Sequence, residues 1–435
     1  MILSYIEISL WIATAFFMLS SASSIMQSHI HGTSRLDWIK QHLGTKTPYT
    51  SEVENITSVD EPGCKLLQFH SVIRHGTRWP TARNTAIIRD MASRLLMSNS
   101  DKLQWLKHWD DPFLAGKAGY LHITGQHEMY HMGRRIAKRY KRLLESVDLD
   151  TDELQFASDA QSRTSRSGSA FHLALLEQTG DLTSAFISPT SWSIYPKATD
   201  SYIHMGYTCP RWLSEVYTNP NATYQADAWI EVMLPPIADR LSTEFEVELS
   251  VYDIKAIYVA CAFETSFFGN YSDWCSLLDP DDILTLEYAE DLEHYYKFSY
   301  GHEINRWVAT DLMSMLMRRL ESNEPPKMSF QFGHSQTILF LQTFLNLNQD
   351  SDILRADTPI DMIHERKFRT SKVSPFAANI GLELHDCSGT RYIRALLSEQ
   401  EVILKGCEEA MCPLDQFKSW IGEKLKQDYD MVCRL

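Results

Sequence analysis

The sequence predicts an α/β protein: a three-layer core, in which helices flank a mixed sheet, with an inserted, mostly helical cap. Short runs of β-branched and aromatic residues alternate with stretches in which apolar residues recur at helical spacing. The chain of 435 residues is 44% hydrophobic and 22% charged, the composition of a globular protein with an ample core. We expect the core at 61–175 and 301–435 and the cap at 176–300.

The first predicted strand ends in a histidine between two arginines. Residues 64–73 (CKLLQFHSVI) are mainly apolar, β-branched and aromatic, and Arg74-His75-Gly76-Thr77-Arg78 follows directly. Apolar residues at helical spacing then predict a helix over 83–97. The histidine is therefore expected at the carboxyl end of a strand, where Gly76 leaves room for a ligand to approach the backbone.

A second unit repeats this arrangement. Residues 328–332 (MSFQF) predict a short strand, Gly333-His334 follows, and residues 337–347 predict an apolar helix. A third predicted strand, 154–157, leads into a segment that contains Arg163. Ligands of open α/β sheets bind beyond the carboxyl ends of the strands. We therefore expect both histidines and the arginines to converge at one end of the sheet.

The run RHGTRWPT at 74–81 matches the RHGxRxPT signature of histidine acid phosphatases, a branch of the histidine phosphatase superfamily. Further blocks resemble the multiple inositol polyphosphate phosphatases of that branch, and the resemblance covers about residues 60–433. These blocks are CAFE at 261–264, WCSL at 274–277, LEY at 286–288 before DL at 291–292, PFAAN at 375–379 and CPL at 412–414. The resemblance implies hydrolysis of inositol polyphosphates, up to phytate, through a phosphohistidine.

The resemblance also implies a role for each side chain at the strand ends. His75 is the nucleophile, Arg74, Arg78 and Arg163 hold the phosphoryl oxygens, and His334 binds the same group. A neutral imidazole can attack phosphorus, and guanidinium groups stay charged and match phosphate oxygens in geometry. No metal or other cofactor is needed where enough cationic groups surround the phosphate.

One position departs from the family pattern. Active members generally have His-Ala-Glu or His-Asp here, with a carboxyl that protonates the leaving oxygen, whereas this chain has His334-Ser335-Gln336. A glutamine amide can hydrogen-bond the substrate but cannot serve as a general acid. General acid catalysis is typically worth about 10²–10⁴-fold. We therefore expect a slower phosphatase, or one that takes the proton from another residue, from water or from a neighbouring substrate phosphate.

Three other functions compete with this hypothesis. The first is a catalytically weak protein or decoy that only binds phosphorylated ligands. The second is a zinc peptidase, because HEMYH at 127–131 fits HExxH, with two zinc-binding histidines and a glutamate base on one helix. Arg134 and Ala137 replace the glycine and histidine of the extended motif, and the segment resembles a phosphatase helix, so we interpret the match as accidental. The third is a phosphoglycerate mutase of the same superfamily. The N-terminal leader and the cysteines, described next, disfavour this cytosolic chemistry.

Features of both ends and of the cysteines favour export. Residues 1–24 contain an apolar run at 10–19 followed by small residues, which is typical of a signal peptide. The lack of Lys or Arg before it, together with Glu7, leaves an uncleaved anchor as the alternative. The final residues are not a retention signal of the Lys-Asp-Glu-Leu type. Three sequons are glycosylation candidates in an exported chain, at Asn55, Asn221 and Asn270.

The eight cysteines predict four disulfides in an oxidising compartment. Their pairing is implied by the resemblance alone: Cys64–Cys387, Cys209–Cys433, Cys261–Cys275 and Cys407–Cys412. The formal net charge of −15 argues against nucleic acid or an anionic membrane as partner. A small polyanionic phosphate ester must therefore be captured by a local basic pocket, against the overall field.

Overall fold

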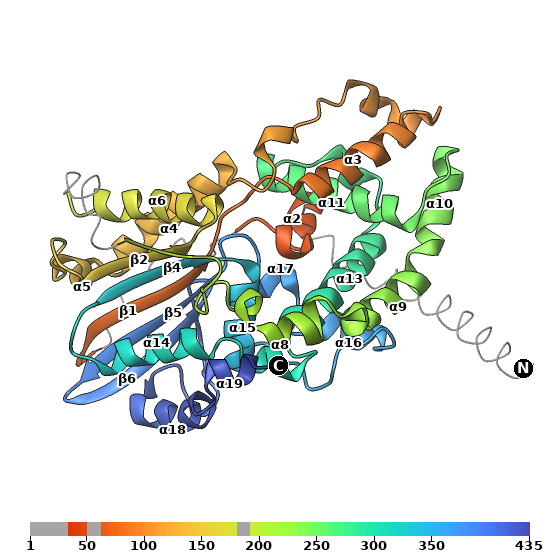
Figure 1. The fold of residues 1–435 in the computed structure, drawn as a ribbon. Helices are drawn as coiled ribbons and strands as arrows, with labels where there is room; N and C mark the ends of the chain where they lie inside the picture. Colours follow the sequence, from red (N-terminus) through yellow and green to blue (C-terminus); the bar gives the residue numbers. More distant parts are fainter. Residues whose placement is uncertain (1–33, 50–61, 181–191) are drawn as a thin grey trace, which may run out of the picture.

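The computed structural model describes residues 34–49, 62–180 and 192–435 (Figure 1). The predicted leader at 1–24 and the sequon at Asn55 lie outside these ranges. Within them, no helix combines the length and the apolar composition that crossing a membrane requires.

An eight-stranded mixed sheet lies at the centre of the described chain, in the order β3-β2-β4-β1-β5-β6-β7, with β8 paired to β6. Strands β3, β2, β4 and β1 are mutually parallel, and the remaining strands pair antiparallel. The strands are β1 (Cys64–Arg74), β2 (Leu154–Asp159), β3 (Trp192–Tyr195), β4 (Met328–Gly333), β5 (Asn379–Cys387), β6 (Thr390–Leu397), β7 (Gln400–Val402) and β8 (Cys412–Pro413).

The parallel strands β1 and β4 at the centre of the sheet end at the same height, and each is followed by a histidine. All residues of β4 and the last seven of β1 are buried, as expected for central strands of a sheet that is covered on both faces. Arg74 and Gly333 are the last paired residues of β1 and β4. His75 and His334 therefore leave adjacent strands side by side, as the strand-end pattern predicted.

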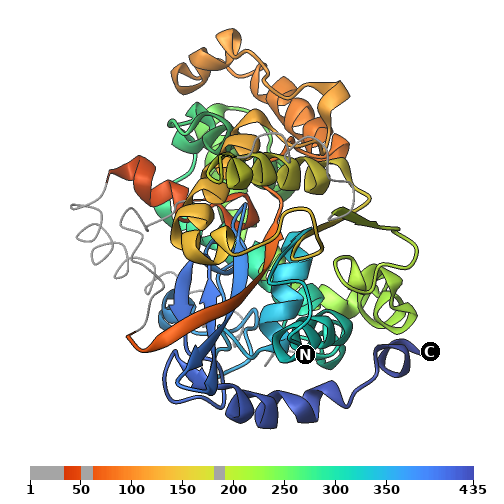
Figure 2. The same cartoon turned by 90° about the vertical axis from the view of Figure 1, so that its left-hand side faces the viewer.

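Helices cover both faces of the sheet, so the predicted three-layer α/β core is confirmed. One face carries α4 (Ile123–Arg139), α5 (Lys141–Glu145) and α6 (Ser162–Glu177) (Figure 1). The other carries α14 (Thr310–Glu321), α15 (Ser335–Phe344) and α18 (Leu414–Leu425). The view turned by 90° again places α18 on the side of the sheet away from α4 and α6 (Figure 2).

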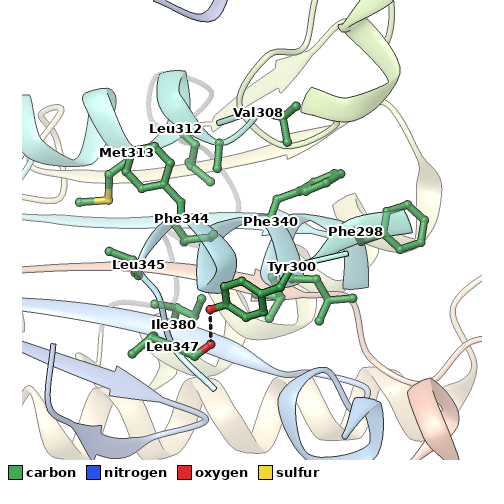
Figure 3. Packing of buried hydrophobic residues seen from close by; sticks show 14 of the residues in the cluster. Phe298, Tyr300, Val308, Leu312, Met313, Phe340, Phe344, Leu345, Leu347 and Ile380 are labelled. Carbon is green, nitrogen blue, oxygen red and sulfur yellow. Dashed lines mark hydrogen bonds between the residues drawn. The ribbon is translucent and has the colours of Figure 1, made fainter. Parts of the chain in front are cut away.

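Large apolar side chains fill the layer between α14, α15 and the sheet. Figure 3 shows Phe340 and Phe344 of α15 beside Leu312 of α14. Tyr300 is buried in the same cluster, and its hydroxyl donates a hydrogen bond of 2.7 Å to the Leu347 carbonyl. Burial of each such side chain typically contributes about 1.5–3 kcal/mol.

The helical part of the molecule draws on two stretches of sequence. It contains α9 (Tyr224–Met233), α10 (Pro235–Phe245), α11 (Val251–Phe268) and α13 (Pro280–Phe298), all within the range predicted for the cap. It also contains α3 (Ala82–Leu95), because the apolar face of α3 packs in the same cluster as α11. Strand β3, by contrast, falls within 176–300 but pairs with β2 in the sheet. The helical part thus differs from the predicted 176–300 at both points.

Short helices connect these elements. They are α2 (Arg35–Lys40), η1 (Gly44–Lys46), η2 (Asp101–His108), η3 (Ala115–Lys117), η4 (Met205–Thr208), α8 (Pro210–Trp212), η5 (Leu213–Tyr217), η6 (Pro220–Thr223), α12 (Asp273–Ser276), η7 (Glu303–Arg306), α16 (Ile360–Glu365), α17 (Thr370–Val373) and α19 (Tyr429–Cys433). Of these, η1 contacts the functional site directly, because the Thr45 carbonyl accepts a hydrogen bond from Arg74.

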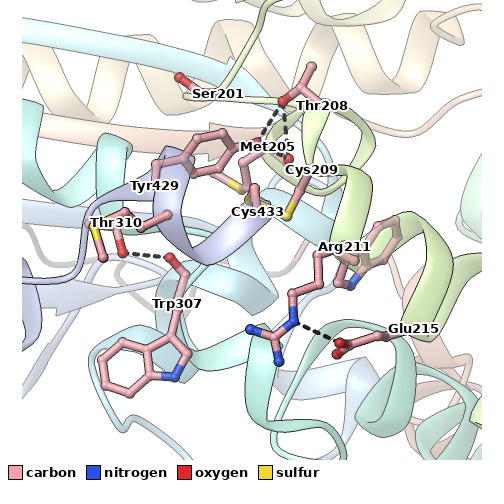
Figure 4. Close-up of a disulfide and its surroundings, with 12 residues drawn as sticks. Ser201, Met205, Thr208, Cys209, Arg211, Glu215, Trp307, Thr310, Tyr429 and Cys433 are labelled. Atoms are coloured by element: carbon pink, nitrogen blue, oxygen red, sulfur yellow. Dashed lines mark hydrogen bonds and ion pairs between the residues drawn. A yellow bond between two sulfur atoms is a disulfide. The ribbon is translucent and has the colours of Figure 1, made fainter. Parts of the chain in front are cut away.

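All four predicted disulfides are present in the structure. They join Cys64 to Cys387, Cys209 to Cys433, Cys261 to Cys275 and Cys407 to Cys412, with Cα–Cα distances of 4.1, 4.7, 4.8 and 5.5 Å. Figure 4 shows the bond that ties α19 to the start of α8, where the hydroxyls of Thr208 and Tyr429 lie 2.8 Å apart. The sequon residues Asn221 and Asn270 are exposed.

Candidate active site

His75 lies at the end of β1 with its ring arranged as a nucleophile. Its backbone N–H donates to the Gly333 carbonyl at 2.9 Å, and its side chain is buried. Ring atom Nδ1 is 2.8 Å from the Gly76 carbonyl oxygen. A carbonyl only accepts, so Nδ1 carries the proton and Nε2 keeps its lone pair. Burial, reinforced by Arg163 and Arg74, lowers the pKa of His75 well below its usual value, which keeps the ring neutral in acid.

Three arginines surround this histidine. Arg74 is buried, and its Nη1 donates to the carbonyls of Thr45 and Ser374, each at 2.6 Å. Arg78 is half-buried and donates to the Trp79 carbonyl at 2.8 Å. Burial, together with the charges of neighbouring arginines, lowers the pKa of Arg74 to about 9 and that of Arg78 to about 10. Both guanidinium groups therefore stay charged at neutral and acidic pH.

Two donors of this cluster lack a protein acceptor. The Nε atoms of Arg74 and Arg163 are buried and have no hydrogen-bond partner among the described residues. A buried donor without a partner costs about 1–3 kcal/mol, and more when it is charged. An anion with several oxygen acceptors would satisfy both donors at once. The arginine cluster is therefore suited to a phosphoryl group.

His334 lies beside His75, and their ring centroids are 5.5 Å apart. Its Nε2 is 2.8 Å from Oδ2 of Asp159, and Nη2 of Arg163 is 3.3 Å from its Nδ1. Burial lowers the pKa of His334, and the hydrogen bond to Asp159 opposes that shift. Asp159, at the end of β2, was not among the predicted site residues. The strand-end rule that pointed to Arg163 also applies to it, since only three residues separate the two.

Gln336 lies in the first turn of α15, partly exposed, at the same end of the sheet. The Ser335 hydroxyl is 3.4 Å from its side-chain oxygen, and its side chain hydrogen-bonds the phenol of Tyr207. Burial raises the pKa of Tyr207 to about 12. Position 336 therefore brings an amide, not an acid, to the site. The six predicted residues His75, His334, Arg74, Arg78, Arg163 and Gln336 all lie at this end of the sheet.

Residues 65–398 match the family described as the histidine phosphatase superfamily, branch 2. The chain belongs to this family. The curated relatives of the chain are phosphatases, and the chain is accordingly a phosphomonoesterase. The resemblance drawn from the sequence is thereby confirmed.

Curated relatives align over most of this histidine phosphatase. Multiple inositol polyphosphate phosphatase 1 of Dictyostelium discoideum is 28% identical, over 88% of this chain and 75% of its own. The chicken protein of the same name is 26% identical, over 96% and 95%. A thiamine-repressible acid phosphatase of Schizosaccharomyces pombe is 28% identical, over 92% and 88%.

Solved structures share the fold. The phytase from D. castellii superposes with a TM-score of 0.78 at 18% identity, over 91% of this chain and 87% of its own. The multiple inositol polyphosphate phosphatase of Bifidobacterium longum, in complex with inositol hexasulfate, superposes with a TM-score of 0.73 at 16% identity, over 88% and 97%. These likenesses confirm the fold class of the histidine phosphatase.

Gly76 serves a purpose different from the one predicted. A Cβ atom at this position would lie 2.4 Å from the carbonyl oxygen of Gly125 in α4, and one at Gly125 would lie 2.1 Å from the carbonyl oxygen of Thr77. The expectation that Gly76 makes room for a ligand is therefore corrected. The two glycines let the backbone after β1 lie directly against α4.

The HExxH pattern of this histidine phosphatase does not form a zinc site. Its Glu128 accepts hydrogen bonds from the Thr77 N–H at 2.6 Å and the Thr77 hydroxyl at 2.8 Å. His127 and His131 are exposed on the outer side of α4. Burial raises the pKa of Glu128 to about 7, although the bonds from Thr77 oppose this. The glutamate thus supports the loop that carries His75.

Asp159, His204 and His334 bring potential metal ligands within 4.8 Å of one another. Asp159 and His334 are already joined by a hydrogen bond, and the guanidinium of Arg163 lies 3.3 Å from His334. Arg74 also acts electrostatically on His334. This cationic surrounding favours an anion over a divalent cation, so we assign no metal to these residues.

Proposed function

We propose that this histidine phosphatase is a secreted enzyme that hydrolyses inositol polyphosphates through a phosphohistidine on His75. The observation that carries the proposal is the free Nε2 lone pair of a buried, neutral imidazole beside arginines with unpartnered N–H groups. This combination suits attack on the phosphorus atom of a dianionic phosphate ester.

Each residue then has a defined role. Nε2 of His75 attacks phosphorus, and the guanidinium groups of Arg74, Arg78 and Arg163 hold the equatorial oxygens as negative charge develops on them. His334 donates a hydrogen bond to the same phosphoryl group. Water then attacks the phosphohistidine and releases phosphate, which restores the imidazole of His75.

Charge and relatives together favour a polyphosphorylated substrate. The arginine cluster carries more positive charge than one phosphomonoester needs, within a chain whose net charge is −15. Two of the relatives named above are multiple inositol polyphosphate phosphatases, and the Bifidobacterium longum structure holds inositol hexasulfate.

Secretion is supported by the disulfides and by the sequons. Four disulfides persist in an oxidising compartment and are rare in the cytosol. Asn221 and Asn270 are exposed, as glycosylation would require. Together with the leader predicted at 1–24, these features make the lumen of the secretory pathway or the exterior the proposed location.

Phosphate release at acidic pH tests the proposal. The substrates are phytate and p-nitrophenyl phosphate, and the proteins are the wild type, His75→Ala and Gln336→Glu. We expect the wild type to release phosphate from both substrates and His75→Ala to lose at least about 10³-fold of kcat, because no nucleophile remains. A phosphoenzyme captured by alkaline quenching should be present in the wild type and absent from His75→Ala.

Two outcomes contradict the proposal. Full activity of His75→Ala would remove the phosphohistidine mechanism altogether. If the wild type binds phytate and releases nothing while Gln336→Glu is active, the chain is instead a binding or decoy protein of this fold. Gln336 is the observation that favours this second candidate, because an amide cannot protonate the leaving group.

A further inference from the structure

A buried carboxylate is fixed against the second histidine of the site. Asp159 is fully buried and His334 is 3% exposed. Oδ2 of Asp159 lies 2.8 Å from Nε2 of His334, while Oδ1 accepts hydrogen bonds from the Thr164 hydroxyl at 2.5 Å and the Gln161 backbone N–H at 3.3 Å. Both oxygens of this carboxylate accept hydrogen bonds, which keeps the group ionised and holds it against the imidazole.

These contacts determine where His334 carries its proton. Arg163 can only donate, so the Nδ1 atom that it approaches at 3.3 Å holds a lone pair. Nε2 then carries the proton and donates it to Asp159. The side-chain nitrogen of Gln161 lies 3.3 Å from the same Nε2, farther than the carboxylate, and it does not change this assignment. The free Nδ1 atom thus faces the arginines that would hold the phosphoryl group.

We propose that His334, held by Asp159, is the general acid of this enzyme and replaces the carboxyl that position 336 lacks. The inference rests on the proposed phosphatase mechanism. A bound phosphate dianion draws the Arg163 guanidinium onto its own oxygens and leaves Nδ1 free to take a proton. The resulting imidazolium lies between the Asp159 carboxylate and the dianion, so its charge is compensated on both sides.

The proton and the electron pairs balance over the two steps. In the first, the Nε2 lone pair of His75 forms the P–N bond, the P–O bond to the leaving group breaks, and its electron pair takes the Nδ1 proton of His334. In the second, water attacks phosphorus and gives a proton to Nδ1, while the P–N electron pair returns to His75. Nδ1 of His334 is thus protonated again in the phosphate complex. It returns that proton to solvent when phosphate departs and Arg163 approaches Nδ1 again, and it takes up another when the next substrate dianion binds.

Two neighbouring side chains compete for this role. The His204 ring lies 5.4 Å from that of His334, and its Nδ1 has no partner within the described ranges; Asp159 acts on it only electrostatically, whereas it hydrogen-bonds His334. Tyr207 contacts Gln336, but burial raises its pKa to about 12, so it releases a proton poorly. Of the three, His334 alone combines a carboxylate partner with an unprotonated ring nitrogen that faces the arginine cluster.

Leaving groups of different basicity test this proposal. An alkoxide needs a proton as it departs, whereas p-nitrophenolate departs without one. We therefore expect Asp159→Asn to lower kcat for glycerol 2-phosphate by about 10²–10³-fold and kcat for p-nitrophenyl phosphate by less than about tenfold. The phosphoenzyme should still form from p-nitrophenyl phosphate. His75→Ala abolishes both reactions, so failure of the mechanism as a whole is distinguished from failure of the acid.

A rescue and a control separate positioning from simple damage to the fold. Adding Gln336→Glu to Asp159→Asn should restore at least tenfold of the lost activity on glycerol 2-phosphate, because it supplies another acid. His204→Asn should leave the ratio of the two substrates unchanged. Equal losses on both substrates, or a shift of that ratio in His204→Asn, would overturn the proposal. Should Asp159→Asn not fold, His334→Gln assayed on the same substrates decides between these outcomes.

Discussion

His75 and His334 are the same residue type at adjacent strand ends, and their neighbours give them opposite proton arrangements. The Gly76 carbonyl fixes a proton on Nδ1 of His75, whereas the Asp159 carboxylate fixes one on Nε2 of His334. Each ring therefore presents a different atom to the space between them. At the scale of single residues, the role of each histidine therefore depends on which hydrogen-bond acceptor fixes the proton on its ring.

The role of Glu128 as a hydrogen-bond acceptor can be tested by substitution, with a matched control on the same helix. Glu128→Ala removes the acceptor of both Thr77 hydrogen bonds and leaves two donors without a partner. We expect kcat/KM to fall about tenfold or more, because the loop that carries His75 loses its support, and the melting temperature to fall. His131→Ala, on the exposed side of α4, should change neither quantity.

A zinc-dependent enzyme would behave differently in this comparison. Changing His131 would then remove a metal ligand and abolish activity, and a chelator would act on the wild type. Metal content measured by atomic emission, together with the two rate constants, separates these cases.

The residues of the site were predictable to different degrees. His75, Arg74 and Arg78 lie within one run of sequence after one strand, so their convergence needs no knowledge of the rest of the fold. Asp159 and His334 are 175 residues apart, and only the pairing of β2 with β4 brings them together. No periodicity in the sequence records which strands are neighbours.

At the scale of elements, the contact of the β1 loop with α4 positions the nucleophile. Gly76 and Gly125 allow two backbones to touch, and Thr77 then reaches Glu128 of the same helix. The sequence predicted α3 from its spacing of apolar residues, but not that this helix would pack against α11. The spacing of apolar residues predicts which face of a helix is buried, whereas the element that packs against this face depends on the three-dimensional fit of the side chains.

Gly76→Ala tests the contact between the β1 loop and α4, and a glycine without close neighbours serves as the control. The added methyl would meet the backbone of Gly125 at 2.4 Å, so the loop must shift and take His75 with it. We expect kcat/KM to fall at least about 10²-fold and the unfolding free energy to fall by about 2 kcal/mol or more.

The control is Gly422→Ala within α18, where no other described residue lies within 4 Å of the new methyl. Alanine is the better helix former by about 0.8–1 kcal/mol, so this variant should be slightly more stable and equally active. Thermal denaturation and steady-state kinetics measure both effects. An active, stable Gly76→Ala protein would show that the close contact is not required.

At the scale of the whole molecule, buried histidines link stability to acidity. Burial lowers the pKa of His42 to about 4, that of His70 to about 3 and that of His172 to about 4, from 6.5. The unfolded chain therefore binds protons below pH 6.5 that the folded chain does not. The stability due to these neutral rings is fully present above pH 6.5 and is lost as the pH falls toward 4.

His70 isolates this effect. Its ring lies within hydrogen-bond distance of Ser329 and Gln68 at the centre of the sheet. Between pH 6 and 4 the unfolding free energy of the wild type should fall by about 1.4 kcal/mol per pH unit more than that of His70→Gln. Urea denaturation at several pH values measures the two slopes. Parallel slopes would show that His70 is protonated in the folded protein.

The two hydrogen bonds that hold Arg74 cannot both form until the chain has been synthesised beyond Ser374. Thr45, before β1, and Ser374, far beyond it, both accept hydrogen bonds from the same guanidinium nitrogen. A nascent chain that has emerged only as far as β4 contains the nucleophile and all three arginines of the cluster, but Arg74 has only one of its two carbonyl acceptors. The complete arrangement therefore forms only after most of the chain has been translated, and proteolytic fragments that end before Ser374 lack it permanently.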